Sequence, residues 1–169
     1  MISACSAPLT GRVPFRFHLM ALVARVPALL SWMRRKSLAE PEWAARRSIP
    51  DPVLRAQTFR DPQTSPLIRE FQVKLLDQLA ARLSGTRNDI IQSRAPFGGT
   101  VEKIGKPVLV VYGTKDDIVP FAQAESLAAR LPHAELLVLS GGGHMSLFTH
   151  LQLIQPRIRQ FLQVYSPNA

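Results

Sequence analysis

The sequence predicts an α/β protein with parallel strands, mainly because two strand-forming segments flank a predicted helix. Val108–Tyr112 is a continuous apolar run between Pro107 and Gly113, and Glu135–Leu139 is a second run followed by Ser140 and three glycines. A continuous apolar run is typical of a strand that is buried on both faces, as in a parallel sheet. Pro120–Leu131 begins with proline and has one apolar face, as helices often do. This order of elements predicts a right-handed βαβ unit.

Asp116 and His144 each follow one of the two predicted strands. Parallel strands lie about 4.8 Å apart and their carboxyl ends share one edge, so we expect both side chains at that edge. A carboxylate there accepts the imidazole Nδ1–H, which fixes the tautomer and leaves Nε2 as a general base. An aspartate after a strand is also a common turn residue, and a histidine after glycines is a common loop residue.

The residues around this pair resemble the C-terminal part of the α/β-hydrolase fold family. Gly113–Pro120 (GTKDDIVP) is similar to the G-x-x-D-x-h-V-P segment, with h apolar, that follows the seventh strand of that family. Gly141–His144 (GGGH) is similar to the loop after the eighth strand. The resemblance implies that Asp116 is the orienting acid, Asp117 a solvated turn residue and His144 the general base. The implied activity is hydrolysis of an ester, amide or related bond of a small-molecule substrate by a nucleophile–His–Asp mechanism.

The resemblance is close over residues 104–162 and also implies a domain organisation. Residues 1–8 are expected to be equivalent to the sixth strand, which gives a partial sheet of about three parallel strands equivalent to strands 6–8. Residues 9–95 are expected to form a mostly helical cap that prolines divide into short helices. Residues 96–169 are expected to be the C-terminal hydrolase portion.

Apolar residues at helical spacing predict two longer helices. Ser65–Leu83 lies in the cap, and its apolar face consists of Leu67, Phe71, Leu75, Leu79 and Leu83. Met145–Val164 is predicted to be the last helix, with one face packed on the sheet.

The chain contains no G-x-S-x-G or similar nucleophile turn. The resemblance implies that the nucleophile elbow and the oxyanion-hole amides belong to strands that this chain lacks, so we expect a truncated hydrolase that is inactive alone. Cys5 has small residues two positions away on either side, but Pro8 follows where an elbow passes into a helix. We therefore interpret Cys5 as a buried thiol. Ser140 and Ser146 flank the histidine loop without a strand–turn–helix context.

Composition narrows the classes of function. The 169 residues are 46% hydrophobic and 20% charged, which suits a globular chain. A single cysteine allows no internal disulfide, which is compatible with a reducing compartment and the cytoplasmic location that we expect. The four histidines have no partners at metal-ligand spacing, and no phosphate-binding glycine loop is present, so neither a metal nor another cofactor is predicted.

The net charge of +9 is concentrated between residues 12 and 60. The basic residues there are Arg12, Arg16, Arg25, Arg34, Arg35, Lys36, Arg46, Arg47, Arg55 and Arg60, opposed by Glu40, Glu42 and Asp51. Such a surface attracts nucleic acid, anionic membranes or acidic partners, and it suggests a second class of function, a non-catalytic interaction module. Aromatic residues do not interleave with the charges as base stacking requires, so nucleic acid is not expected. A solvated basic helical face remains the simplest interpretation.

The N-terminal region has two further features. His18–Trp32 is apolar, but Arg25 and Pro27 interrupt it and it is too short to cross a bilayer, so we expect no stable membrane insertion. Met1–Leu38 has arginines and no acidic residue, which also resembles an organellar transit segment. If Met1–Ser6 is a strand without its neighbour, its apolar edge favours self-association.

Overall fold

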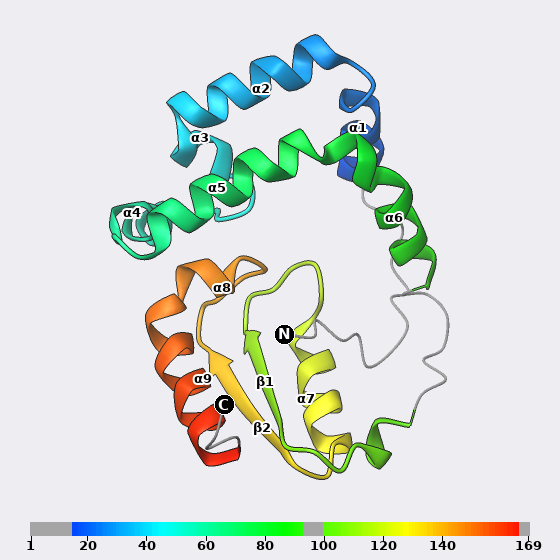
Figure 1. Ribbon diagram of the computed structural model, residues 1–169, viewed down its shortest axis with the longest axis vertical. Helices are drawn as coiled ribbons and strands as arrows, with labels where there is room; N and C mark the ends of the chain where they lie inside the picture. The colour runs from blue at the N-terminus through cyan, green and yellow to red at the C-terminus, as the bar shows by residue number, and fades with distance from the viewer. Residues whose placement is uncertain (1–14, 93–99, 166–169) are drawn as a thin grey trace. The chain divides into compact units, whose positions relative to one another are not determined.

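The computed structural model describes residues 15–92 and 100–165 of the chain, and they form two compact units (Figure 1). Residues 15–92 belong to a helical unit and residues 100–165 to an α/β unit. Each unit has buried apolar side chains of its own, such as Ile68 in the first and Ile154 in the second. Within the described ranges, no helix is long and apolar enough to cross a membrane.

Prolines open several helices of the helical unit. The unit consists of α1 (Phe15–Val23), α2 (Pro27–Ala39), α3 (Pro41–Ala45), α4 (Pro52–Arg60), α5 (Thr64–Asp77) and α6 (Leu79–Gln92). The prolines at the starts of α2, α3 and α4 occupy first-turn positions, where a missing N–H costs nothing. Asp51 caps α4, because its Oδ1 accepts hydrogen bonds from Val53 N at 2.8 Å and Leu54 N at 3.0 Å.

Packing between α2 and α5 holds this unit together. Ile68 of α5 and Ala45 of α3 are fully buried. Arg34 of α2 and Asp77 of α5 form an ion pair with 2.8 Å between Nε and Oδ1. Both of these side chains are about half exposed, so the pair adds little stability and the buried apolar side chains contribute most of it.

The predicted helix Ser65–Leu83 is two helices, because the chain breaks at Gln78 between α5 and α6. The predicted apolar face is also wrong for α5. Leu67, Phe71 and Leu75 are 48%, 38% and 36% exposed, whereas the buried residues of α5 are Thr64, Ile68 and Leu76. The buried face of α5 is therefore shifted by one residue relative to the predicted face. It includes Thr64, which the pattern of apolar residues does not identify.

The α/β unit contains the predicted βαβ arrangement. Its elements are the 3-10 helix η1 (Val101–Lys103), β1 (Val108–Gly113), α7 (Phe121–Arg130), β2 (Ala134–Leu139), α8 (Ser146–Thr149) and α9 (Leu151–Tyr165). The two strands pair in parallel, with Val108 opposite Ala134 and Gly113 opposite Leu139. Helices α7 and α9 lie on either side of the strand pair (Figure 1). The predicted third strand, Met1–Ser6, lies outside the described residues.

A small apolar core joins α7 to the strands. It consists of Val101, Val110, Tyr112, Val119, Ala124, Leu127 and Leu131. At its margin, Arg130 Nε donates to Glu102 Oε1 at 2.7 Å, which lowers the pKa of Glu102 and raises that of Arg130. Arg157 of α9 forms an ion pair with Glu135 of β2. The first pair joins α7 to η1, and the second joins α9 to β2, the strand that leads to the His144 loop.

Two expectations for this unit need correction. The strands are not fully buried on both faces, since Leu109 and Val111 are half-buried and Val138 is 47% exposed. The predicted last helix, Met145–Val164, is interrupted at His150, which separates α8 from α9. Among the apolar side chains of this segment, Ile154 is fully buried, whereas Leu147, Ile158 and Leu162 are exposed.

Candidate active site

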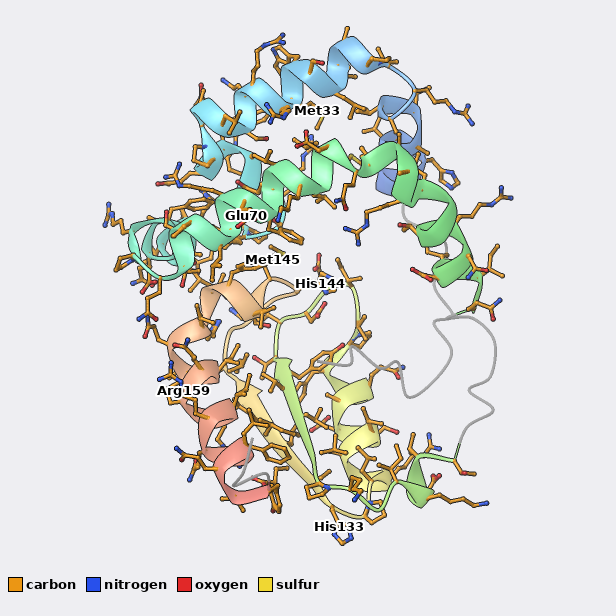
Figure 2. The ribbon with its side chains drawn as sticks, in the orientation of Figure 1. Met33, Glu70, His133, His144, Met145 and Arg159 are labelled. Carbon is orange, nitrogen blue, oxygen red and sulfur yellow. The ribbon has the colours of Figure 1, made fainter. Side chains whose placement is uncertain are left out.

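The two loops that carry the predicted site leave the same edge of the sheet. Because β1 and β2 are parallel, Gly113 and Leu139 end them side by side. His144 lies beyond this edge, whereas His133, which precedes β2, lies at the opposite end of the unit (Figure 2). The topology therefore brings together the loop containing Asp116 and the loop containing His144.

Glycines allow the two loops to approach closely. A Cβ placed on Gly113 would lie 2.2 Å from the carbonyl oxygen of Gly142, which no side chain tolerates. A Cβ on Gly142 would in turn lie 3.2 Å from the Cα of Gly113. Gly141 has a φ of 74°, in the left-handed region that favours glycine. The local geometry thus requires glycine at position 113 and favours it at Gly141 and Gly142.

Hydrogen bonds then join the two loops. Thr114 Oγ1 accepts from Gly141 N at 2.9 Å, and Lys115 N donates to Gly142 O at 2.8 Å. Leu139 O accepts from both Thr114 N and Gly142 N, each at 3.1 Å. The end of β2 and the turn after β1 therefore share a continuous hydrogen-bond network.

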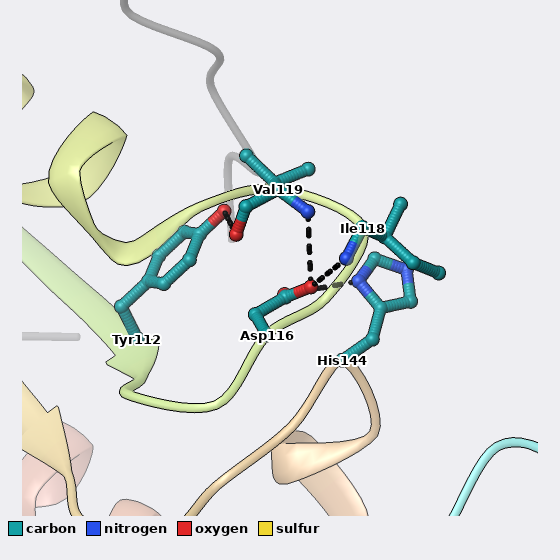
Figure 3. Close-up of polar contacts among 5 residues, drawn as sticks. All are labelled: Tyr112, Asp116, Ile118, Val119 and His144. Atoms are coloured by element: carbon teal, nitrogen blue, oxygen red, sulfur yellow. Dashed lines mark hydrogen bonds and ion pairs between the residues drawn. The ribbon is translucent and has the colours of Figure 1, made fainter. Parts of the chain in front are cut away.

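Asp116 is fixed by the backbone of its own turn. Its Oδ1 accepts from Ile118 N at 2.9 Å and from Val119 N at 3.0 Å, which is an Asx-type turn (Figure 3). Tyr112 Oη donates to Val119 O at 3.4 Å and ties the same turn to β1. The Asp116 side chain is only 9% exposed. These contacts leave Oδ2 as the oxygen that can bind another group.

That second oxygen binds His144. Asp116 Oδ2 and His144 Nδ1 are 3.0 Å apart (Figure 3). A carboxylate can only accept hydrogen bonds, so Nδ1 carries the proton and Nε2 has the lone pair of the neutral ring. The His144 side chain is 42% exposed, which leaves its ring accessible. A histidine held in this tautomer can take a proton from a nucleophile through Nε2.

Asp116 therefore stabilises its own turn through Oδ1 and binds His144 through Oδ2. The sequence is compatible with Asp116 as a common turn residue or as a hydrogen-bond partner of the histidine, and in the structure it is both. Asp117, by contrast, is exposed, as expected for a turn residue. Cys5, the thiol in an elbow-like context, lies outside the described residues.

Sequence reasoning missed two residues that support the histidine loop. Thr114 occupies a variable position of the G-x-x-D segment, so nothing in the pattern marks its hydroxyl. His150 has no partner at metal-ligand spacing in the sequence, but its Nε2 donates to Ser140 O at 3.3 Å and its Nδ1 lies 2.8 Å from Thr149 Oγ1. Among the residues with described positions, no group of three or more His, Cys, Asp or Glu side chains is placed to hold a metal ion.

Comparison with known proteins identifies the family of this chain. The family model described as alpha/beta hydrolase fold matches residues 18–151, which include most of the helical unit and both loops of the site. This chain belongs to the α/β-hydrolase fold family. The family assignment confirms the resemblance of the two motifs, whereas the catalytic roles of Asp116 and His144 stay predictions.

Curated relatives of this α/β-hydrolase chain match it over limited stretches. It is 29% identical over 96 residues to alpha/beta hydrolase domain-containing protein 17C of Homo sapiens, which is 56% of this chain and 29% of that protein. It is 33% identical over 69 residues to pimeloyl-[acyl-carrier protein] methyl ester esterase of Xanthomonas axonopodis pv. citri (strain 306), which is 41% of this chain and 27% of that protein. The chain thus spans less than a third of the length of the curated relatives that it matches.

Solved structures share the fold of this α/β-hydrolase chain. An alpha/beta hydrolase fold protein from Nakamurella multipartita superimposes with a TM-score of 0.66 and 23% identity, covering 90% of this chain and 54% of that one. A thermophilic esterase from Thermogutta terrifontis superimposes with a TM-score of 0.54 and 21% identity, covering 95% of this chain and 53% of that one. At these identities the likeness concerns the fold alone.

Proposed function

We propose that this chain provides the acid and the general base of an α/β hydrolase that cleaves an ester, amide or related bond. Asp116 is the orienting acid and His144 is the base. The observation that carries the proposal is the 3.0 Å contact between Asp116 Oδ2 and His144 Nδ1 at the carboxyl edge of parallel strands. The esterase activity in the printed name of a curated relative is consistent with this bond class.

In the proposed reaction, His144 Nε2 removes the proton of a nucleophile as that nucleophile attacks the carbonyl carbon. The imidazolium that forms is stabilised by the Asp116 carboxylate, which stays ionised. The same proton then goes to the leaving group when the tetrahedral intermediate collapses. The nucleophile and the oxyanion-hole donors are not identified in this chain, whose sequence has no G-x-S-x-G segment.

A chimera tests whether this acid–base pair is competent. Residues 104–162 of this chain, which include Asp116 and His144, replace the equivalent segment of the Xanthomonas esterase, and the esterase retains its own remaining sequence. The chimera should hydrolyse a short-chain p-nitrophenyl ester, because the transplanted Asp116 and His144 complete the triad. In the chimera, Asp116→Asn should lower kcat by a factor of about 10⁴ and His144→Ala by a factor of about 10⁶, as expected for removal of the acid and the base of a triad.

Asp117→Asn is the matched control, because it removes a neighbouring exposed carboxylate that does not contact His144. It should leave kcat nearly unchanged. A chimera that folds and melts cooperatively but has no turnover would contradict the proposal. So would a chimera in which Asp117→Asn is as damaging as Asp116→Asn.

A second candidate function is an interaction module that uses the basic helical unit. The favouring observation is a cluster on α2 and α3 in which Lys36 and Arg46 lie 5.4 and 5.3 Å from the ring of Trp43. Trp32 packs edge-on against the same ring, and it is 47% exposed. The test measures binding to anionic vesicles or to an acidic protein. Binding that weakens steeply as salt is added, and that is lost in Arg46→Glu, would support this function.

A further inference from the structure

The loop that carries His144 needs an external restraint, because three glycines precede the histidine. Gly141, Gly142 and Gly143 allow more backbone conformations than any other residues, so a defined His144 position requires contacts from outside the loop. A backbone bond from the β1 turn supplies part of this restraint, from Lys115 N to Gly142 O, whereas the bonds from Gly142 N to Leu139 O and from Ser146 N to Gly143 O close turns along the loop itself. Gly141 itself is held by a side chain, the hydroxyl of Thr114, at 2.9 Å.

We propose that Thr114 is a positioning residue that uses its hydroxyl to hold the His144 loop against Asp116. This inference rests on the proposed function, because it concerns the same acid–base pair. Thr114 lies two residues before Asp116, and it receives a hydrogen bond from the first glycine of the loop that ends at His144. Thr114 therefore links the turn that carries Asp116 to the loop that carries His144.

The geometry favours positioning over a general contribution to stability. Thr114 is exposed and belongs to no hydrophobic core, so its side chain adds little to the packing of the unit. Its hydroxyl nevertheless contacts Gly141, the residue with positive φ from which the glycine loop departs. Loss of this bond leaves the loop joined to the β1 turn mainly through backbone contacts near Gly142, and His144 gains freedom to leave Asp116.

The test measures how fast the His144 Nδ1 proton exchanges with solvent, by NMR on the full 169-residue chain with ¹⁵N-labelled histidine. Thr114→Val keeps the shape of the side chain and removes the hydroxyl. It should accelerate exchange about two- to tenfold, which is the factor expected for loss of one hydrogen bond. Thr114→Ser, which restores the hydroxyl, should exchange at a rate close to that of the unaltered chain.

Thr100→Val is the matched control. Thr100 is an exposed threonine of the same unit that precedes η1, and its side chain makes no capping hydrogen bond. Exchange at His144 should not change in this variant. If Thr114→Val behaves like Thr100→Val, Thr114 does not position the pair and the inference is wrong.

Two further results separate the possible failures. Thr114→Ala also removes the hydroxyl, so it should accelerate exchange as Thr114→Val does; acceleration by valine alone would assign the effect to its bulk and overturn the inference. A slowly exchanging His144 proton in the unaltered chain that Asp116→Asn does not affect would contradict the proposed pair itself. In the active chimera, Thr114→Val should lower kcat and leave KM unchanged. Because loss of folded protein gives the same split, the variant must also melt at the same temperature as the unaltered chimera for the lower kcat to support the inference.

Discussion

Gly113 and Gly142 meet backbone to backbone, which sets the distance between the end of β1 and the histidine loop. Any Cβ at Gly113 would overlap Gly142 backbone atoms, 2.2 Å from its oxygen and 2.5 Å from its carbonyl carbon. Backbone atoms cannot rotate away as a flexible side chain can. We therefore expect Gly113→Ala to lower the free energy of unfolding of the α/β unit by about 3 kcal/mol, the upper end for overpacking.

Denaturant unfolding measures this change, and Gly105→Ala is its matched control. Gly105 lies in the same unit, and a Cβ there would have no atom within 4 Å. The control variant should unfold at nearly the same denaturant concentration as the unaltered chain. Equal stability of the two alanine variants would show that the loops are not in close contact at Gly113.

The cap of α4 allows a second prediction. Asp51 Oδ1 accepts from Val53 N and Leu54 N, so Asp51→Ala leaves two donors of the first turn without this partner. The expected loss is about 1 kcal/mol in the free energy of unfolding of the helical unit. Asp51→Asn should be nearly neutral, because asparagine is as good a cap as aspartate. Thermal unfolding followed by circular dichroism distinguishes the two variants, and an alanine variant as stable as the asparagine variant would contradict the capping role.

A third prediction concerns activity of the chain alone. Purified protein should release no p-nitrophenol from short-chain esters above the uncatalysed rate, because the sequence has no nucleophile turn for His144 to activate. The variants His144→Ala and Cys5→Ala are assayed in parallel with the unaltered protein. Turnover that disappears in His144→Ala would show that this chain contains a nucleophile, and turnover that also disappears in Cys5→Ala would assign that role to Cys5.

The side of β1 that faces away from β2 gives a fourth prediction. Val108 N bonds to His133 O and Thr114 N bonds to Leu139 O, so the alternate residues Leu109 and Val111 direct their backbone groups away from β2. Among residues 15–92 and 100–165, β2 is the strand that pairs with β1, and an edge without a second partner favours pairing with another chain. We expect self-association that increases with salt, since salt screens the repulsion between chains of net charge +9. Sedimentation velocity at several concentrations measures this, and a monomer at all salt concentrations would contradict it.

The sequence predicted the part of the fold that depends on local composition. The βαβ order, the parallel pairing and the edge shared by Asp116 and His144 all follow from two apolar runs and the residues that end them. The proline-divided helices also follow, because a proline limits where a helix can start regardless of its tertiary contacts.

The remaining details depend on tertiary contacts that a hydrophobic pattern does not contain. The buried face of α5 includes Thr64 and excludes Leu67, because the packing against α2 selects it rather than the leucine repeat. The supporting bonds of the site were missed for a similar reason. The Thr114 hydroxyl bonds a residue 27 positions later in the chain, and no local pattern encodes that contact.

The tautomer of His144 tests the proposed acid–base pair most directly. Two-bond ¹H–¹⁵N correlation spectra of the labelled chain at neutral pH report which ring nitrogen carries the proton. We predict the Nδ1–H tautomer, because the Asp116 carboxylate lies 3.0 Å from Nδ1 and can only accept. Asp116→Asn should mix or reverse the tautomers, whereas Asp117→Asn should leave them unchanged. An Nε2–H tautomer in the unaltered chain, or one that Asp116→Asn does not change, would contradict the pair.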